Sequence, residues 1–543
     1  MTLRLTALVP LALLSACAAS RSAPPADWRT RAEATGFLET TRYDEAMALL
    51  RAFDAASDEI HLTTYGYTYE GRALPLAVIG APDASPASVR ATGKTRIFVQ
   101  ANIHAGEVEG KEAALGLVRS VALGERRAWL DEVVLLVAPI YNADGNERVR
   151  LDQRGAQHGP LGGMGQRHNA QDLDLNRDCV KLETPEARSM ARLMADYAPH
   201  VALDLHTTNG SAHGYPLTYD IAGGPNVDAE LTRLLREELL PAVTRAIRAE
   251  DGREIFWYGG PTRGDAPVWS NDSDLYRPRY THTYFGLRNS LGILSEAYSY
   301  ATFEERIHFT YRFVEEIVDW VAAHGPRVRA AQAAADEERL HGRELALSCT
   351  LTRTSEAVEI LLADLVEERN PYLPDRPLRR LVPGRERRVT MPHDGTLVAH
   401  TSERVPAAYV LPAPATPAER RLRATLLDRL EAHGIRHATL DAARPFSGER
   451  FRIQSSSASA EPYQGAHHPR TLDGTWESHT TELAAGALVI PLAQPLARLV
   501  FLFLEPRSDD GFATWNLFDA VLAADPAPEF FPLLRTFDAP ARD

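Results

Sequence analysis

A histidine and a glutamate three residues apart, His104 and Glu107, lie at the end of an apolar run, residues 95–103. An imidazole nitrogen and a carboxylate oxygen at the end of a buried strand can bind one metal ion, and zinc suits this pair of ligand types. Short His/Glu pairs also arise by chance, so the metal interpretation depends on further ligands elsewhere in the chain.

A third candidate ligand follows a second apolar run. The run covers residues 201–205, and His206 follows it directly and leads into a loop that contains Gly210. The loops at strand ends of α/β sheets are where such sheets bind ligands. Two imidazoles and one carboxylate leave a fourth zinc position to water and lower the pKa of that water toward about 7. The alternative is a strand-end histidine that only makes hydrogen bonds.

Two further segments have the composition of a substrate site. In the segment 174–178 (DLNRD), Asn176 and Arg177 together suit a carboxylate, which arginine binds with two parallel hydrogen bonds. Arg167 ends a glycine-rich loop, and a positive group beside the metal could stabilise an oxyanion. The alternative for these arginines is an ordinary surface salt bridge.

A glutamate, Glu296, ends a further apolar run at residues 292–295. A carboxylate in this position is costly unless it is paired or functional. Beside a metal-activated water it would serve as the general base and later pass the proton to the leaving amine. The alternative is a strand-end glutamate in a salt bridge.

Five motifs in a fixed order carry a family resemblance: HAGE (104–107), NADG (142–145), DLNRD (174–178), DLHTT (204–208) and ILSEAYSY (293–300). In this order they resemble the zinc carboxypeptidases, the M14 metallopeptidases, over about residues 60–325. The resemblance implies one zinc ion per chain. It also implies the following roles: His104, Glu107 and His206 as zinc ligands, Asn176 and Arg177 for the substrate's C-terminal carboxylate, Arg167 for the scissile carbonyl, and Glu296 as general base.

Two details of the family pattern stay open. The family has a tyrosine that closes over the substrate, and Tyr276, Tyr280 and Tyr284 are all candidates here. The arginine for the scissile carbonyl occurs at more than one distance from the Asn-Arg pair, so Arg154 is the second choice after Arg167.

The N-terminus resembles a bacterial lipoprotein signal. Arg4 precedes an apolar segment, residues 5–14, that is too short to span a bilayer, and residues 14–17 (LSAC) resemble a lipobox. This pattern predicts cleavage before Cys17 and its acylation, which would anchor the chain to a membrane. Ala18 resembles the choice of outer-membrane lipoproteins. We therefore expect a lipid-anchored protein of the bacterial cell envelope, on the periplasmic face; the alternative is a plain secretory signal in which Cys17 is incidental.

Composition and cysteine usage exclude some functions. The chain has 59 basic and 73 acidic residues and a formal net charge of −14, which argues against nucleic acid as a partner. Cys179 and Cys349 could form one disulfide bond or remain two free thiols. No base is evident beside either cysteine, so the sequence does not support a cysteine hydrolase.

The order of apolar runs predicts the organisation of the 543 residues. A signal segment (1–17) and a tether (18–30) precede an α/β catalytic domain (31–325), a zinc-carboxypeptidase-like mixed sheet flanked by helices. A helical linker (326–349) leads to a β-rich α+β domain (350–543) whose role is structural support or substrate binding. Strands are predicted at 74–79, 96–103, 133–139, 201–205, 292–295, 357–363, 387–391, 407–411, 488–491 and 498–504, and helices at 38–55, 111–123, 185–197, 229–249, 304–323 and 418–433.

The leading hypothesis is a zinc-dependent metallocarboxypeptidase whose substrate is a peptide with a free C-terminus. A zinc-dependent deacylase of small amino-acid conjugates would share the metal site; against it stand the Asn-Arg pair, the large C-terminal region and the envelope location. A binding protein without catalytic activity would be expected to lack a ligand or the base, and neither is missing here.

Overall fold

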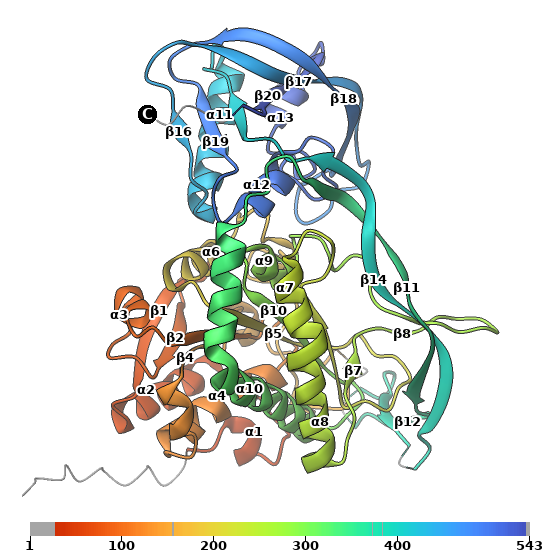
Figure 1. The fold of residues 1–543 in the computed structure, drawn as a ribbon. Coiled ribbons are helices and arrows are strands. Elements are labelled where there is room, and N and C mark those ends of the chain that lie inside the picture. The colour runs from red at the N-terminus through yellow and green to blue at the C-terminus, as the bar shows by residue number, and fades with distance from the viewer. Residues whose placement is uncertain (1–27, 155–156, 372, 383, 539–543) are drawn as a thin grey trace, which may run out of the picture.

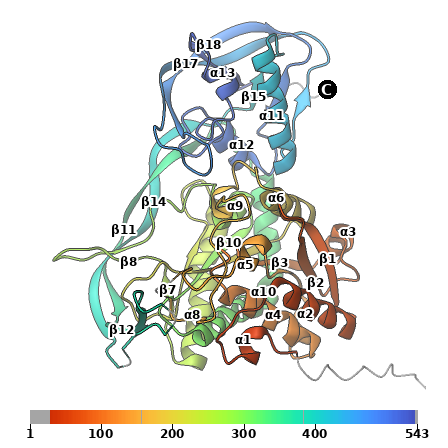
Figure 2. The same cartoon turned by 180° about the vertical axis from the view of Figure 1, so that it is seen from behind.

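The structure is a computed structural model that describes residues 28–154, 157–371, 373–382 and 384–538. Figure 1 shows two lobes, the lower one coloured red to green and the upper one blue. A long two-stranded ribbon, in teal, runs from the upper lobe down one side of the lower lobe. Figure 2 shows the same arrangement from behind.

The lower lobe is built on an eight-stranded mixed sheet in the order β1-β2-β4-β3-β5-β10-β6-β7. The four central strands β4, β3, β5 and β10 are parallel to one another, and the outer pairs β1/β2, β2/β4 and β10/β6 are antiparallel. This arrangement confirms the predicted α/β class with a mixed sheet. The strands are β1 (Ile60–Tyr67), β2 (Ala73–Ile79), β3 (Thr95–Ala101), β4 (Val133–Ala138), β5 (Val201–Thr207), β6 (Leu217–Ile221), β7 (Phe256–Trp257) and β10 (Leu291–Ala297).

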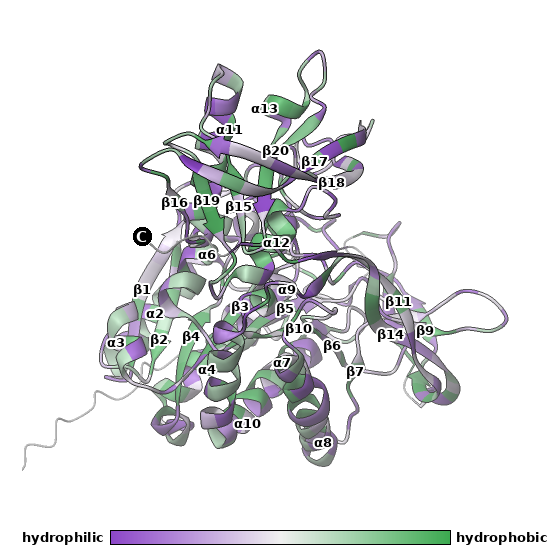
Figure 3. Ribbon diagram, turned by 45° about the horizontal axis from the view of Figure 1, so that its top comes forward, coloured by the Kyte–Doolittle hydropathy of each residue, from purple (hydrophilic) through white to green (hydrophobic). Residues whose placement is uncertain are grey.

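Both faces of this sheet are covered by apolar side chains, because alternate residues of a strand point to opposite faces. In β3, Ile97 and Val99 pack on one side with α2, α4, α8 and α10, whereas Phe98 packs on the other side with α6 and α9. The apolar colouring of the central strands in Figure 3 reflects this burial.

The helices are α1 (Arg31–Ala34), α2 (Tyr43–Ala56), α3 (Pro86–Ala91), α4 (Glu109–Ala122), α5 (Ala143–Glu147), α6 (Pro185–Tyr197), α7 (Ala229–Arg233), α8 (Leu240–Asp251), α9 (Thr281–Leu287) and α10 (Phe303–Glu337), with the short helical segments η1 (Arg127–Asp131), η2 (Leu175–Arg177) and η3 (Leu234–Leu239).

The predicted limits of three segments were wrong. Helix α2 begins at Tyr43 rather than at residue 38, because residues 40 and 41 instead bind the buried carboxylate of Glu112. The expected helix at 304–323 and the expected helical linker are largely one helix: α10 continues through Pro326 to Glu337, packed on α4, α8 and β3. The last residues of that linker already belong to strand β11. Trp28, which was expected in the tether, is buried with its ring 5.2 Å from that of Phe53.

The chain beyond α10 contributes to three further sheets. Strands β11 (Glu344–Leu362) and β14 (Arg387–Arg404) make the long ribbon, in which β14 also pairs with β9 (Trp269–Ser270) of the lower lobe and β9 pairs with β8 (Gly260–Pro261). Strands β12 (Leu365–Glu368) and β13 (Leu378–Leu381) form a small hairpin at its far end. The upper lobe is a six-stranded sheet with helices α11 (Pro417–His433), α12 (Ala497–Leu504) and α13 (Asp519–Leu522); its strands, in spatial order, are β16 (Ala438–Thr439), β19 (Leu488–Pro491), β15 (Ala408–Leu411), β20 (Phe530–Thr536), β17 (Arg444–Ala458) and β18 (Arg470–Leu483).

One predicted strand of the upper lobe is a helix. Residues 498–504 (RLVFLFL) read as a strand, but they belong to α12, all of whose side chains are buried. A short run that is apolar on every side gives neither the period of 2 nor the period of 3.6, so its pattern does not distinguish a buried strand from a buried helix. The predicted helix at 418–433 is confirmed as α11, and Gly434 ends it in the left-handed conformation.

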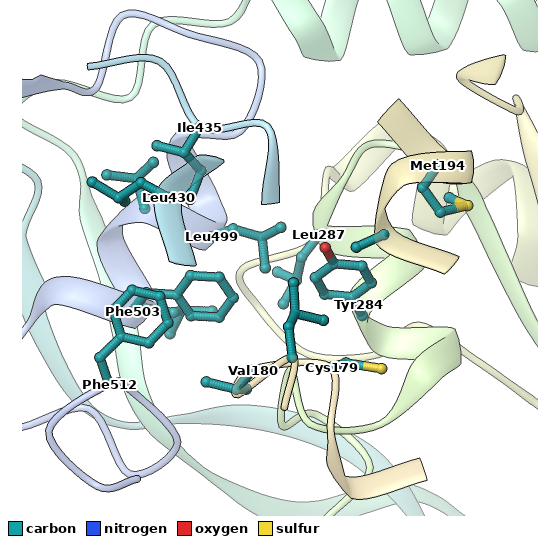
Figure 4. Close-up of a cluster of buried hydrophobic side chains, with 14 of the residues drawn as sticks. Cys179, Val180, Met194, Tyr284, Leu287, Leu430, Ile435, Leu499, Phe503 and Phe512 are labelled. Atoms are coloured by element: carbon teal, nitrogen blue, oxygen red, sulfur yellow. The ribbon is translucent and has the colours of Figure 1, made fainter. Parts of the chain in front are cut away.

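The two lobes share one hydrophobic core. Leu499, Phe503 and Phe512 of the upper lobe point toward Val180 and Tyr284 of the lower lobe, as Figure 4 shows. At this contact the imidazole of His433 lies 2.9 Å from the Tyr284 hydroxyl and 3.1 Å from the carbonyl oxygen of Val180. Burial of these apolar side chains holds the upper lobe against α9 and against the segment that follows η2.

Three expectations concern the membrane and the cysteines. Cys17 and the whole signal segment lie outside the described residues. Among the helices that are described, none has the length and apolar content that crossing a bilayer requires. Cys179 and Cys349 are both free thiols, the first buried and the second partly exposed. Burial raises the pKa of the Cys179 thiol well above its ordinary value, which makes it a poor nucleophile.

Candidate active site

Three neighbouring parallel strands bring the candidate metal ligands and the candidate base to one edge of the sheet. His206 lies in β5, and Glu296 lies beside it as its register partner in β10. His104 follows the end of β3, where Asn102 has φ of 63° and turns the chain out of the strand. A left-handed conformation at a residue other than glycine is costly and is common at functional sites. The parallel order of β3, β5 and β10 therefore explains why residues far apart in sequence meet.

The three candidate ligands form one buried cluster. Donor atoms of His104, Glu107 and His206 lie within 4.8 Å of one another. The Glu107 carboxylate faces both rings: its Oε1 lies 2.9 Å from Nδ1 of His104, and its Oε2 lies 2.8 Å from Nδ1 of His206. Among the described residues this is the one group of three His, Cys, Asp or Glu side chains arranged to hold a metal ion.

The far nitrogen of each histidine faces a second carboxylate. Nε2 of His104 lies 3.1 Å from Asp174 Oδ1, and Nε2 of His206 lies 2.9 Å from Asp204 Oδ2. Histidines that bind metals usually donate their other N–H to such a group, which fixes the ring and its tautomer. Each Nδ1 therefore faces Glu107, and in its deprotonated form it can bind a cation held between the two groups.

The electrostatics of the cluster favour a bound cation. Burial by itself lowers the pKa of His206, but the carboxylates of Asp204 and Glu107 outweigh it and hold that pKa well above its ordinary value. Burial likewise raises the pKa of Glu107, and the charges of Arg154, His104 and His206 reverse this and hold it well below its usual range. Three carboxylates close to two imidazoles thus stabilise positive charge here, as a divalent metal ion requires.

The cluster rests on a buried support beneath β5. Gly110 of α4 lies so close to this strand that a Cβ there would be 2.8 Å from the Cβ of Leu205. The hydroxyl of Thr207 donates to the buried carboxylate of Glu109, whose other oxygen lies 3.5 Å from Nε of Arg306. Arg306 also donates to the carbonyl oxygens of Gly159 and Ala301. This network joins α4, β5 and α10 beside the candidate metal ligands.

Glu296 is the carboxylate of the cavity that lacks a partner. Its Oε2 is buried and makes no hydrogen bond to any described residue. Burial and the nearby charge of Glu107 raise its pKa to about 8. A free carboxylate oxygen that faces the cavity is what a general base requires, and the salt-bridge alternative lacks a partner among the described residues.

Asn176 and Arg177 line the same cavity from η2. Oδ1 of Asn176 accepts hydrogen bonds from the backbone N–H and the hydroxyl of Thr281, at 2.9 and 3.0 Å, which fixes the orientation of its amide. The guanidinium of Arg177 lies 4.3 Å above the ring of Tyr280 and donates from Nη1 to the carbonyl oxygen of Asn176. Both side chains are therefore held in place before any substrate binds.

The two candidate arginines have different positions. Arg167 lines the cavity and donates from Nε and Nη2 to Asp174 Oδ2, at 2.9 and 2.7 Å. Arg154 lies on the other side of the cluster, where it donates to Glu107. Both arginines contact a candidate ligand, since Nη1 of Arg167 lies 3.5 Å from Nδ1 of His104. Arg167 is the one of the two that lines the cavity, as a group that acts on substrate must.

Of the three candidate tyrosines, Tyr280 lines the cavity. The hydroxyl of Tyr276 donates to Asp509 of the upper lobe, and that of Tyr284 is held between His433 and Arg288. Tyr258 also lines the cavity, and the sequence did not single it out.

Further cavity residues carried too little sequence signal to be found. The full lining is His104, Glu107, Arg167, Asn176, Arg177, His206, Thr207, Asn209, Tyr258, Asp272, Leu275, Tyr280, His282, Leu294 and Glu296. Asp174 and Asp204, which face the two histidines, begin the DLNRD and DLHTT motifs. Each stands two residues before a predicted site residue, Asn176 or His206, and that spacing is the sequence signal that could have identified them. Asp272 and Leu275 lie between β9 and α9, and His282 lies in α9; no sequence motif marks these three residues.

The chain is similar in sequence to known carboxypeptidases. Residues 46–246 match the zinc carboxypeptidase family. The matched segment includes the candidate metal ligands and the Asn-Arg pair and ends before Glu296. The chain is 24% identical over 469 residues to "Carboxypeptidase 2" of Trichophyton equinum, which covers 82% of this chain and 78% of that protein. A "Probable carboxypeptidase 2" of Trichophyton verrucosum is 30% identical over 139 residues, or 25% and 24% of the two chains.

Solved structures also resemble the chain over about half its length. A metallo-carboxypeptidase from Burkholderia cenocepacia has 17% identity and a TM-score of 0.38, over 52% of this chain and 69% of that one. A carboxypeptidase A from Helicoverpa armigera has 16% identity and a TM-score of 0.38, over 55% and 75%. Together, the family match and the carboxypeptidase relatives support the assignment of this chain as a metallocarboxypeptidase.

Proposed function

We propose that the chain is a zinc-dependent carboxypeptidase that hydrolyses the peptide bond next to a free C-terminal carboxylate. The observation that carries this proposal is the meeting of three groups in one cavity: the His104–Glu107–His206 cluster, the unpartnered Glu296, and the Asn176–Arg177 pair. The His104–Glu107–His206 cluster and Glu296 would carry out hydrolysis of an amide, and the Asn176–Arg177 pair would bind a carboxylate.

The donor set fits zinc. Two imidazole nitrogens and one carboxylate oxygen leave a coordination position for water, and the carboxylates of Asp174 and Asp204 orient the two rings. When bound there, zinc would polarise the scissile carbonyl and lower the pKa of a water molecule.

The protein's own groups account for the remaining chemistry. Glu296 would take the proton from the attacking water and pass it to the leaving amine nitrogen. Arg167 would stabilise the negative charge that develops on the carbonyl oxygen. Because Glu296 is buried, which raises its pKa, its ionised form is a stronger base than an exposed glutamate.

Carboxylate recognition is tested with matched peptide pairs that end in either a free carboxylate or an amide. We expect wild-type kcat/KM to be at least about tenfold higher for the free carboxylate, because charge-assisted bonds to Arg177 and Asn176 are lost with the amide. In Arg177→Met this ratio should fall toward one.

Arg188→Met is the matched control, because Arg188 pairs with Asp428 at the lobe interface rather than in the cavity. An unchanged preference in Arg177→Met would contradict the assignment. Equal wild-type rates on both peptides, or cleavage of acyl-amino acids alone, would favour the deacylase.

We also propose that the chain is lipid-anchored at Cys17 in the bacterial cell envelope, on the periplasmic face. This proposal is supported by the apolar segment 5–14 and the LSAC sequence at 14–17. Membrane fractionation of the full-length chain tests it: recovery of Cys17→Ser with the membranes, as for wild type, would contradict the anchor.

A further inference from the structure

A turn of the upper lobe lies against the back of the candidate carboxylate site. It is the connection between β17 and β18, residues 459–469, here called the β17–β18 tip. Tyr463 accepts a hydrogen bond through its hydroxyl oxygen from Nε of Arg177, at 3.1 Å. Gln464 accepts one through Oε1 from the backbone N–H of Asp174, at 3.2 Å. Two adjacent tip residues thus bind both ends of the segment 174–177.

These contacts reach side chains that the proposed reaction uses. Asp174 orients His104 and binds Arg167, and Arg177 is the proposed carboxylate ligand. Nη1 of Arg177 is bound to the carbonyl oxygen of Asn176, and Nε is bound to Tyr463. With Nε and Nη1 held in this way and the ring of Tyr280 against its flat face, the guanidinium is fixed in one plane. Fixing an arginine fork before binding lowers the entropy cost of forming its two parallel bonds to a carboxylate.

The tip is itself held rigidly. Tyr463 and His467 pair across a tight turn in which Gln464 and Gly465 have φ of 52° and 80°. The ring of Tyr463 stacks on Trp515 at 5.9 Å, and Nε2 of His467 lies 2.9 Å from the carboxylate of Glu183. The tip is therefore anchored both in its own lobe and in the loop that follows η2.

Trp515 links this anchor to the lower lobe. The ammonium of Lys181 and the guanidinium of Arg279 lie 4.1 and 4.9 Å from its ring, on chain segments that flank the cavity residues Arg177 and Tyr280. Arg279 also pairs with Asp510, and Arg277 pairs with Asp509. The upper lobe thus contacts both segments that supply the proposed carboxylate site.

We propose that the β17–β18 tip is part of the active site, and that Tyr463 and Gln464 are positioning residues for the carboxylate-binding segment Asp174–Arg177. This inference rests on the proposed function, since it assigns the upper lobe a role in the same recognition step. The upper lobe then does more than support the lower lobe structurally. The lobe fixes the arginine that selects a free C-terminus.

The test is Tyr463→Phe, which removes the hydroxyl and keeps the ring on Trp515. For peptides with a free carboxylate we expect KM to rise by about three- to tenfold and kcat to stay within about twofold, because the lost bond orients a group that binds substrate. Inhibition by a product amino acid should weaken by the same factor, and inhibition by its amide should not change. Gln464→Ala should shift KM in the same direction.

The matched control is Tyr67→Phe, because Tyr67 is an exposed residue of β1. A KM in Tyr463→Phe equal to that of wild type would overturn the proposal. So would a defect that appears in Tyr463→Ala and not in Tyr463→Phe, since that result would assign the effect to packing on Trp515.

A binding measurement separates this proposal from the proposed function. Calorimetric titration of the full zinc-loaded chain with an N-acyl amino acid, as a carboxylate ligand, requires no turnover. Weaker binding to Tyr463→Phe than to wild type supports the positioning role even if no peptide is cleaved. Equal binding to the two proteins, or no binding to either, overturns it, whereas loss of peptide cleavage in wild type overturns only the proposed function.

Discussion

Replacement of Glu296 by glutamine is expected to lower kcat by about 10²- to 10⁴-fold, the usual contribution of a general base. Glutamine has nearly the same shape but cannot accept a proton from water. The candidate metal ligands His104, Glu107 and His206 are unchanged, so zinc content and the midpoint of thermal unfolding should stay near those of wild type. Steady-state kinetics combined with metal analysis of the same preparation measures both quantities.

A matched glutamate supplies the control for this variant. Glu186 is also buried, and burial raises its pKa to about 7, but it lies in α6 outside the cavity and binds Tyr69 and Asn169. Glu186→Gln should therefore keep its turnover. If Glu296→Gln turned over at the wild-type rate, the assignment of Glu296 as base would be wrong.

Asp174→Asn is expected to weaken zinc affinity by about 10- to 100-fold, as is common when the carboxylate behind a metal-binding histidine is lost. In the native site Asp174 Oδ1 faces Nε2 of His104 and Oδ2 binds Arg167. An asparagine would keep one acceptor and lose the negative charge that makes the imidazole a strong donor. Activity should fall with the metal and recover when excess zinc is added.

Asp220→Asn is the control, because Asp220 is buried in the same sheet and binds Ile221 and Asn271 rather than a candidate ligand. Competition with a chelator of known affinity measures zinc binding in both variants. Wild-type affinity in Asp174→Asn would show that the contact with His104 does not support the metal.

Much of the active-site geometry could be predicted from sequence, because it depends on strands that are buried on both faces. Such strands appear as short apolar runs, and in a parallel sheet their carboxyl ends meet at one edge. The runs that end near His104, at His206 and at Glu296 are adjacent strands, so the ends of the runs indicated the site.

Other features depend on contacts that a local pattern does not encode. The uniformly apolar α12 read as a strand, and the helix predicted to end at residue 323 continues through Pro326 to Glu337 on tertiary packing. The contact between Tyr463 and Arg177 joins residues 286 positions apart in sequence, and Tyr463 lies in a short turn without a recognisable motif. Only the folded arrangement of the two lobes shows that this turn contacts the cavity residue Arg177.

Product mass spectrometry tests the central claim most directly. The purified, zinc-loaded chain is incubated with a mixed peptide library, with and without a chelator. A metallocarboxypeptidase predicts the release of single C-terminal residues, abolished by the chelator and restored by zinc. Intact peptides after incubation with folded, zinc-loaded protein, or cleavage at internal bonds that the chelator does not affect, would contradict the account.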